Sequence, residues 1–337
     1  MRKTTIEEVA ALARVSIKTV SRVINDEPNV RDTTRLKVRD AIDRLEYRPD
    51  QSARRLAGAR SYLVGLLYDN PSASYVIDVQ DGVLDRCRAE NYEILINPCD
   101  YKNHALCAEI ENLVRHARLD GLILTPPLSD HQELVSMLRK QLIPFVMVAP
   151  PNQSDPARSV FTNDLDVCRE MTRYLASLGH ERIGYIIGHP DHGAVGARYR
   201  GYLEGLLGAG IRLRKGLIGQ GYNSFISGEE AARQLLKRKV RPTAIFAGND
   251  EMAAGAMKAA HEMGLTIPGD LSVAGFDDVP LASQIWPSLT TIRQPIRAMS
   301  EKAADILLNQ IRGEPVNGLQ MIPSAMVIRD STGPIGG

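Results

Sequence analysis

The sequence predicts a multidomain protein, with an all-α helix-turn-helix headpiece followed by an α/β domain of two lobes, each built on a doubly wound parallel sheet. Two observations support this expectation. The charge of the 337-residue chain is uneven, because residues 1–60 hold 14 Lys and Arg against 9 Asp and Glu, and such an excess suits a polyanion. From residue 61 onward, short apolar runs alternate regularly with helical patterns, as parallel sheets covered by helices require.

The headpiece is expected to contain three short helices. Thr5 and Glu8 can form a capping box at the start of the first helix. After a short break, Ser16 is a second N-cap candidate, and the second helix is expected to run to about Asn25. Two short helices joined so tightly form a helix-turn-helix. A third helix, at about residues 32–45, closes the small core with Leu36, Val38, Ile42 and Leu45 expected to face inward.

The exposed side of the second helix carries residue types that read DNA. In a helix-turn-helix this helix enters the major groove. Arg22 can form a bidentate contact with guanine, Lys18 can also donate to guanine, and Ile17 can lie against a thymine methyl group. Short donors suited to phosphate oxygens are Ser16, Thr19, Asn25 and Thr34. The alternative is a three-helix module that binds another protein.

The segment RPDQSARRLAG, residues 48–58, predicts one more short helix, capped by Asp50 and ended by Gly58. Such a helix is too short to persist alone in water. If it folds on DNA, Leu56 can enter the minor groove as a wedge beside Arg55. A simple linker is the alternative interpretation.

The remaining residues predict two similar sets of strands and helices. Strands are expected at residues 62–67, 92–97, 121–124, 145–148, 183–187, 244–247, 272–276 and 326–328, with helices such as 76–90, 104–117, 168–178, 229–237 and 252–263 between them. Ligands bind beyond the carboxyl ends of such strands. This sequence places polar side chains there: Asp69, Thr125, Asn249 and Asp277. A carboxylate and an amide beside an arginine can bridge the hydroxyls of a sugar, although each residue taken alone could equally be a helix cap.

Two segments, TTIEEVAALARVSIKTVSRVIN at 4–25 and RPDQSARRLAG at 48–58, resemble the headpiece and hinge helix of the LacI/GalR family of bacterial transcriptional regulators. The resemblance continues to the C-terminus. It implies a headpiece at 1–48, a hinge helix or linker at 49–60, and an effector-binding and dimerisation domain, like periplasmic binding proteins, at 61–337. Within that domain the N-lobe is expected at about 61–160 and 294–324, and the C-lobe at about 161–293 and 325–337.

The resemblance also implies site residues. Ile17, Lys18, Ser21 and Arg22 take the base-reading positions and Leu56 the intercalating position, while Asp50 stands where Asn is frequent, which favours a capping role. Together with the residue chemistry, this gives an expected DNA-binding set of Thr5, Ser16, Ile17, Lys18, Thr19, Ser21, Arg22, Asn25, Thr34, Tyr47, Ala53, Arg55 and Leu56.

For the effector, HGAVGARYRGYLEG places Arg198 at the family's ligand-binding arginine, and AIFAGNDEMAAG and SVAGFDD place Asn249 and Asp277 at further contacts. Asn223 stands where relatives often have an aromatic residue that stacks on the ligand ring. The expected effector-binding set is Asp69, Tyr75, Thr125, Arg198, Asn223, Asn249 and Asp277.

The expected function is therefore that of a repressor that binds double-stranded, palindromic operator DNA as a homodimer, with an affinity controlled by a small effector, a sugar. The last expected strand is not followed by a leucine heptad, which favours a dimer over a tetramer. The N-terminus is polar and no run of about 18 apolar residues occurs, so the protein is expected in the cytoplasm, on the nucleoid when bound to DNA, with no membrane partner. No cofactor, metal or catalytic residue is expected.

The sequence also bears on other functional classes. The common phosphate-loop, serine-hydrolase, zinc-protease and dinucleotide motifs are missing from the sequence. His189-Pro190-Asp191-His192 is the best metal candidate, and a loop at the lip of a cleft explains it equally well. The four cysteines are interpreted as reduced thiols, with Cys99 and Cys107 as a redox pair the alternative. A sugar-modifying enzyme fused to a DNA-binding module, and an architectural DNA protein without an effector, are the rival functions.

Overall fold

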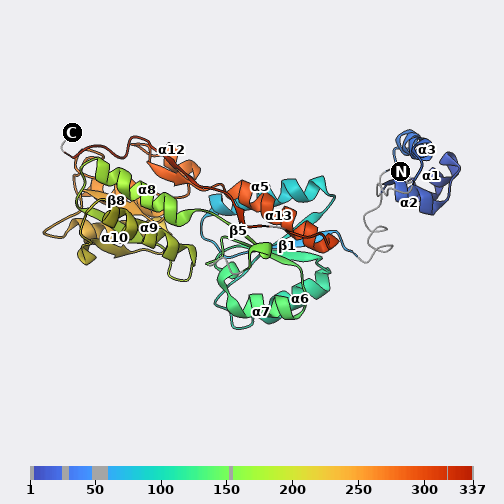
Figure 1. Ribbon diagram of the computed structural model, residues 1–337, viewed down its shortest axis with the longest axis horizontal. Coiled ribbons are helices and arrows are strands. Elements are labelled where there is room, and N and C mark those ends of the chain that lie inside the picture. The colour runs from blue at the N-terminus through green and yellow to red at the C-terminus, as the bar shows by residue number, and fades with distance from the viewer. Residues whose placement is uncertain (1–3, 25–29, 48–59, 152–154, 317, 336–337) are drawn as a thin grey trace. The chain divides into compact units, whose positions relative to one another are not determined.

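The computed structural model describes residues 4–24, 30–47, 60–151, 155–316 and 318–335, and the chain divides into two compact units, 1–61 and 62–337 (Figure 1). The first unit contains α1 (Ile6–Ala13), α2 (Ile17–Ile24) and α3 (Asp32–Arg44). The capping box of α1 is confirmed: the Thr5 hydroxyl accepts from the Glu8 amide, and the Glu8 carboxylate accepts from the Thr5 amide. Ser16 Oγ accepts from the Thr19 amide at 3.2 Å and so caps α2.

The three helices enclose a small apolar core. Its buried members are Val9, Ala10, Ala13, Val20, Val23, Val38, Ala41 and Tyr47. The prediction that Leu36 faces this core is wrong, because its side chain is 68 % exposed. Val38 and Ala41 form the inward stripe of α3, and a residue two positions before Val38 lies roughly 200° around the helix from it.

The second unit begins with a six-stranded parallel sheet in the order β11-β5-β4-β3-β1-β2. Its strands are β1 (Leu63–Tyr68), β2 (Glu93–Pro98), β3 (Gly121–Leu124), β4 (Phe145–Val148), β5 (Ser159–Phe161) and β11 (Gln320–Met321). Helices α5 (Ala73–Ala89) and α13 (Ile296–Arg312) cover one face, and α6 (Leu106–Ala117) and α7 (Gln132–Lys140) cover the other (Figure 1). This sheet and its helices are called the N-lobe below.

The C-lobe is built on a four-stranded parallel sheet in the order β7-β6-β8-β9. Its strands are β6 (Ile183–Ile187), β7 (Ile218–Gln220), β8 (Ala244–Ala247) and β9 (Ser272–Ala274). Helices α8 (Asp164–Ser177) and α9 (Ala194–Gly208) pack on one face, and α10 (Phe225–Leu236) and α11 (Asp250–Glu262) on the other. A short helix, α12 (Pro280–Gln284), follows, and β10 (Thr291–Arg293) pairs with β12 (Ala325–Val327) in an antiparallel ribbon. The predicted class, two doubly wound parallel sheets behind a helical headpiece, is confirmed.

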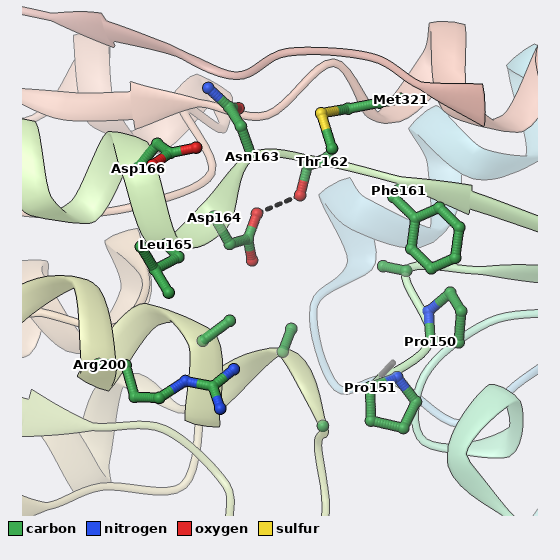
Figure 2. Close-up of a pocket in the computed structure, with 14 residues that line it drawn as sticks. Pro150, Pro151, Phe161, Thr162, Asn163, Asp164, Leu165, Asp166, Arg200 and Met321 are labelled. Atoms are coloured by element: carbon green, nitrogen blue, oxygen red, sulfur yellow. Dashed lines mark hydrogen bonds between the residues drawn. The ribbon is translucent and has the colours of Figure 1, made fainter. Parts of the chain in front are cut away.

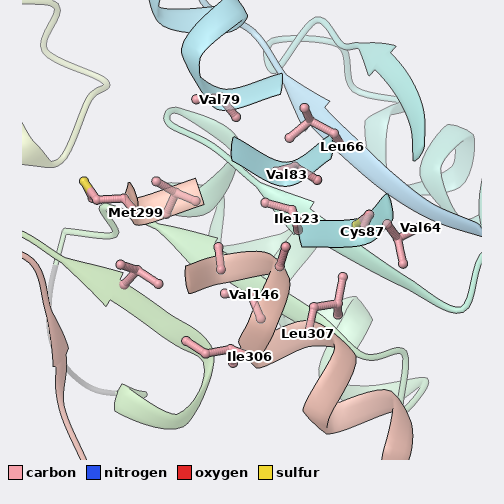
Figure 3. Packing of buried hydrophobic residues seen from close by; sticks show 14 of the residues in the cluster. Val64, Leu66, Val79, Val83, Cys87, Ile123, Val146, Met299, Ile306 and Leu307 are labelled. Atoms are coloured by element: carbon pink, nitrogen blue, oxygen red, sulfur yellow. The ribbon is translucent and has the colours of Figure 1, made fainter. Parts of the chain in front are cut away.

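Three connections join the lobes, and they determine where the cleft lies. The chain passes from β5 to α8, from β10 to α13, and from β11 to β12. The N-lobe core holds α5 and α13 against β1, β3 and β4, through residues that include Val83, Ile123 and Leu307 (Figure 3). Each lobe therefore has its own core, and the residues after the carboxyl ends of its strands are free to form a site between them. Within the described residues, no helix has the length and apolar character needed to span a membrane.

Candidate functional site

In the headpiece, α2 presents the expected base-reading face. Val20 and Val23 are buried against the other helices, whereas Ile17 is 47 % exposed and Lys18 is exposed. Ser21 and Arg22 are half-buried on the same helix. Ile17 is an apolar residue exposed at the N-terminal end of α2. In a helix-turn-helix, the side chains at this end of the second helix contact base edges.

Some of the other residues predicted to contact DNA lie at the ends of the headpiece helices or in its core. Thr5 and Ser16 are N-caps, and the hydroxyls of Ser16 and Thr19 lie 2.9 Å apart. Thr34 is half-buried in the first turn of α3, and Tyr47 is packed into the headpiece core with 8 % of its surface exposed. Asn25, Asp50, Ala53, Arg55 and Leu56 lie outside the described residues.

The second site is a cavity of about 60 Å³ between the lobes, called the inter-lobe cavity here. It lies at the carboxyl ends of the strands of both sheets, as the topology requires. Five of the seven predicted effector residues line it: Tyr75, Arg198, Asn223, Asn249 and Asp277. Residues outside the predicted effector set also line it: Asn70, Ser72, Pro126, Ala149, His192, Ala194, Val195 and Gln294.

Arg198, on α9, is held by three oxygen atoms. Its Nε donates to Asp164 Oδ2 at 3.0 Å, and its Nη1 donates to the Gly248 carbonyl at 2.9 Å and lies 3.8 Å from Asp277 Oδ1. The guanidinium also lies over the Phe276 ring, 3.6 Å from its centroid. Burial lowers the pKa of Arg198, but the two carboxylates outweigh burial and raise it above its usual value. The guanidinium is therefore charged and fixed in orientation.

Asp277 follows β9 with an unusual backbone. Its φ of 116° is strained for a residue with a Cβ. The conformation is held by two backbone hydrogen bonds, from the Asp277 amide to the Ile292 carbonyl and from the Gln294 amide to the Asp277 carbonyl. Burial raises the pKa of Asp277 to about 7, opposed by Arg198 and assisted by Asp164 and Glu251. Its carboxyl group therefore changes charge near neutral pH.

Asn223 and Asn249 are two of the amide side chains in the lining. The Asn249 oxygen accepts from the Met252 amide at 2.9 Å and so caps α11, while its Nδ2 donates to the Asn223 carbonyl at 3.1 Å. Asn223 has a φ of 58° and accepts from the His189 amide at 3.1 Å. Asn249 thus has the capping role, and its nitrogen faces the loop that carries Asn223.

The remaining lining groups are neutral. Burial raises the pKa of the Tyr75 hydroxyl, which therefore stays protonated. Burial also lowers the pKa of His192 to about 4, assisted by His189 and Arg198, so its imidazole is uncharged at neutral pH. The cavity thus offers one cation, one carboxylate, and neutral donors and acceptors, a set that suits several hydroxyl groups of one ligand.

Two predicted residues do not line the inter-lobe cavity. Asp69 accepts from the Tyr101 amide at 3.0 Å and holds the turn after β2. Thr125 is fully buried, and its hydroxyl donates to the Leu67 carbonyl at 3.3 Å, while the next residue, Pro126, reaches the cavity. Within the described part of the chain no three His, Cys, Asp or Glu side chains are arranged to hold a metal ion.

A larger cavity of about 430 Å³ adjoins the inter-lobe cavity and shares Ala149 and Ala194 with it. Pro150, Phe161 and Met321 line its N-lobe side, and Asp164 and Arg200 its C-lobe side (Figure 2). Thr162 donates to Asp164 Oδ1 there, as Figure 2 shows. Asp164 therefore stands between Arg198 and this second space, and no local sequence motif revealed it.

Two hydrogen bonds tie the lobes together at the loop before α9. The Tyr101 hydroxyl donates to Asp191 at 2.5 Å, and the Gly193 amide donates to Asp130 at 2.7 Å. Ligand pockets usually have volumes of about 300–1,000 Å³. The inter-lobe cavity is far smaller than that, with a volume of about 60 Å³.

A helix-turn-helix headpiece joined to a two-lobed α/β domain with a polar cavity between the lobes defines a DNA-binding transcriptional regulator that responds to a small molecule. Residues 5–50 match the model of the bacterial regulatory proteins of the lacI family, and residues 172–332 match that of the periplasmic binding protein-like domain. The chain belongs to the LacI family of bacterial transcriptional regulators.

Similar proteins align along nearly the whole chain. Catabolite control protein A of Priestia megaterium is 32 % identical over 97 % of this chain and 99 % of its own. The crystal structure of the lac repressor dimer bound to operator and the anti-inducer ONPF superposes with a TM-score of 0.79 at 30 % identity, covering 98 % of this chain and 100 % of that one. The complex of the transcriptional regulator CelR with cellobiose gives 0.74 at 28 % identity, with the same coverage. These relatives are regulators, which confirms that this chain is not an enzyme.

Proposed function

We propose that this protein is a homodimeric repressor whose affinity for a palindromic operator is controlled by a sugar bound in the inter-lobe cavity. The observation that carries the proposal is Arg198 beside Asp277, with two asparagines and a tyrosine hydroxyl around them. A charged donor next to a charged acceptor can hold two adjacent hydroxyl groups of one sugar. The cellobiose complex of a relative supports this class of ligand. The protein then works in the bacterial cytoplasm, on the nucleoid when bound to DNA.

The charge balance favours an uncharged sugar. Arg198 already faces two carboxylates, Asp164 and Asp277. An anionic ligand would meet the Asp277 carboxyl group and a guanidinium that is already paired with Asp164, and burying that extra charge is costly at low dielectric. A hydroxyl group, in contrast, can donate to Asp277 and accept from Arg198 without adding charge.

A thermal-shift screen of the purified protein against neutral sugars, sugar acids and nucleobases tests this proposal. A neutral sugar is expected to raise the melting temperature, because a ligand that binds only the folded state stabilises it, by about 2.7 kcal/mol at 100 times its Kd. Gel shifts with and without that sugar then show whether operator binding changes. Stabilisation by a nucleobase or a sugar acid alone would show that the effector class is wrong.

Effector affinity is expected to rise with pH between about 6 and 8. The pKa of Asp277 is about 7 in the free protein, and a sugar hydroxyl donates to the ionised carboxylate, so binding favours the ionised form. Below pH 7 the affinity should therefore fall by up to about tenfold per pH unit, and above it should level off. Calorimetry at pH 6, 7 and 8 measures this, with Asp277→Asn as the control that abolishes the dependence. An affinity independent of pH would remove Asp277 from the hydrogen-bond acceptors of the effector.

The homodimer is expected to have a mass twice that of the 37.1 kDa chain. Ile77 on α5, Ile226 on α10 and Trp286 after α12 are 56 %, 68 % and 89 % exposed, and large exposed apolar side chains often mark subunit contacts. Analytical ultracentrifugation at micromolar concentration measures the mass, and Ile226→Glu should shift the equilibrium toward monomer. A stable tetramer would contradict the expectation drawn from the missing heptad.

A further inference from the structure

A cluster of basic side chains lies at the edge of the C-lobe sheet opposite the effector cavity. The cavity residues Asn223, Asn249 and Asp277 follow the carboxyl ends of β7, β8 and β9. The basic residues lie in or next to the loops that precede the amino ends of β6, β7 and β8. We call them the distal basic surface: Arg173, Arg182, Arg212, Arg214, Lys215, Lys237, Arg238, Lys239 and Arg241. All but Arg182 are exposed.

Two adjoining grooves concentrate this charge. The first has a volume of about 630 Å³ and is lined by Arg173, Arg212 and Arg214. The second has a volume of about 350 Å³ and is lined by Arg214, Arg238 and Lys239, so that Arg214 belongs to both. The two grooves therefore adjoin at Arg214, and both are lined by cations.

Little negative charge opposes these cations. Glu181 lines the first groove, and Asp270, whose pKa is lowered by hydrogen bonds from Thr266 and also by nearby Arg241, lies beside the surface. His180 adds no charge, because burial lowers its pKa and its ring nitrogens face Thr243 and Ser272.

The cations that line the two grooves also differ from many others in residues 62–337 in that they lack ion pairs within the described part of the chain. In the rest of that unit many Arg and Lys side chains form ion pairs, such as Arg86 with Asp305 and Arg233 with Glu262. Within the described residues, the five side chains that line the two grooves form no ion pair with a carboxylate. Gathering like charges without partners destabilises the folded chain by self-repulsion. An anionic ligand would remove that cost.

We propose that the distal basic surface binds the phosphate backbone of double-stranded DNA, as a second contact that does not involve the headpiece. Four of the five groove cations are arginines, whose planar guanidinium matches a phosphate with two hydrogen bonds. The described lining of both grooves holds no Phe, Tyr or Trp side chain, and the ring of His180 is buried, so neither base stacking nor an aromatic anchor for a protein partner is provided. The contact is thus electrostatic and independent of sequence.

The fragment 62–337 tests the proposal without the headpiece. It is one of the two compact units and holds four buried apolar clusters of its own, so it is expected to fold alone. Its binding to a fluorescent duplex of about 20 base pairs is followed by anisotropy at increasing salt. With four phosphates contacted, the slope of log affinity against log salt should be about −3.6. Poly-glutamate serves as the acidic-protein probe.

Charge reversal at the centre of the surface is the decisive comparison. Arg212→Glu/Arg214→Glu should lower DNA affinity at least tenfold and flatten the salt dependence. Arg118→Glu/Lys140→Glu, which changes two exposed N-lobe cations without ion pairs, should lower it less than threefold although the net charge change is the same. Melting curves identify any unfolded variant, and Arg212→Gln/Arg214→Gln then takes its place, with a smaller loss expected. Equal losses of DNA affinity in the two double variants would overturn the proposal. So would a fragment that does not bind the duplex at low salt, or one that binds poly-glutamate but not the duplex.

Discussion

Replacing Arg198 by alanine is expected to weaken effector binding by about 2–5 kcal/mol, which is about 30-fold or more in Kd. The change removes the proposed donor to the ligand, and it also leaves Asp164 and Asp277 without the guanidinium that both contact. Calorimetry with the best sugar of the screen measures the affinity. Gel shifts with and without that sugar measure the response of operator binding, which should disappear at ordinary effector concentrations.

Arg200→Ala is the matched control for Arg198→Ala. Arg200 lies two residues further along α9, is exposed, and lines the adjoining cavity rather than the inter-lobe cavity. Its removal should leave effector affinity almost unchanged. The headpiece is a separate compact unit, so operator affinity without effector should be retained in both variants. A full effector response in Arg198→Ala would show that the effector binds elsewhere.

This prediction depends on a contact that the sequence did not reveal. Arg198 and Asp277 were predicted from the sequence to lie in one site that did not include Asp164, whereas the shorter ion pair of Arg198 is with Asp164, at 3.0 Å against 3.8 Å for Asp277. Asp164 stands 34 residues before Arg198, at the start of the helix that follows the first connection between the lobes. Only the packing of α8 against α9 brings the two side chains together. The sequence around Asp164 contains no motif that indicates this contact.

The position of a polar residue directly after a strand predicted only some of the residues that line the inter-lobe cavity. Asn249 and Asp277 follow β8 and β9 and reach the inter-lobe cavity, but Asp69 and Thr125 follow β1 and β3 in the same way and do not. The difference lies in local hydrogen bonds: the Asp69 carboxylate holds the turn at Tyr101, and the Thr125 hydroxyl turns back to Leu67. Such choices depend on the neighbouring loops, which a pattern of strands does not specify.

The fold class was predictable because short apolar runs alternate with helical patterns in both lobes. The predicted strands correspond to β1, β2, β3, β4, β6, β8, β9 and β12 within one or two residues at each end. In contrast, β5, β7, β10 and β11, each two or three residues long, were not predicted, because so few residues show no period. The equally short β9 and β12 were predicted from the apolar runs at 272–276 and 326–328. The four strands that were not predicted are placed by the sheets that they extend or by the ribbon between the lobes.

Arg22→Ala is expected to cost about 1–3 kcal/mol in operator affinity, about 5- to 150-fold, and to relax base preference at one symmetric position of the operator. Arg22 lies on the same helix as the exposed Ile17 and Lys18, the two residues at its start. A bidentate contact with guanine reads one base pair, so its loss affects that base pair and leaves the preference at the others. Selection of binding sites from random duplexes, with wild type and variant side by side, measures both effects.

Lys37→Ala provides the comparison, because Lys37 is an exposed cation of α3 rather than α2. If it contacts only phosphate, its loss should weaken binding uniformly across sequences and reduce the slope of log affinity against log salt by about 1. The Arg22→Ala variant should instead select a different operator sequence from the wild type. An unchanged sequence logo in Arg22→Ala would assign Arg22 to the phosphate backbone. Equal affinity of the wild type for its selected site and for random duplex at physiological salt would contradict base reading by α2 altogether, because the backbone contacts that remain are the same on every sequence.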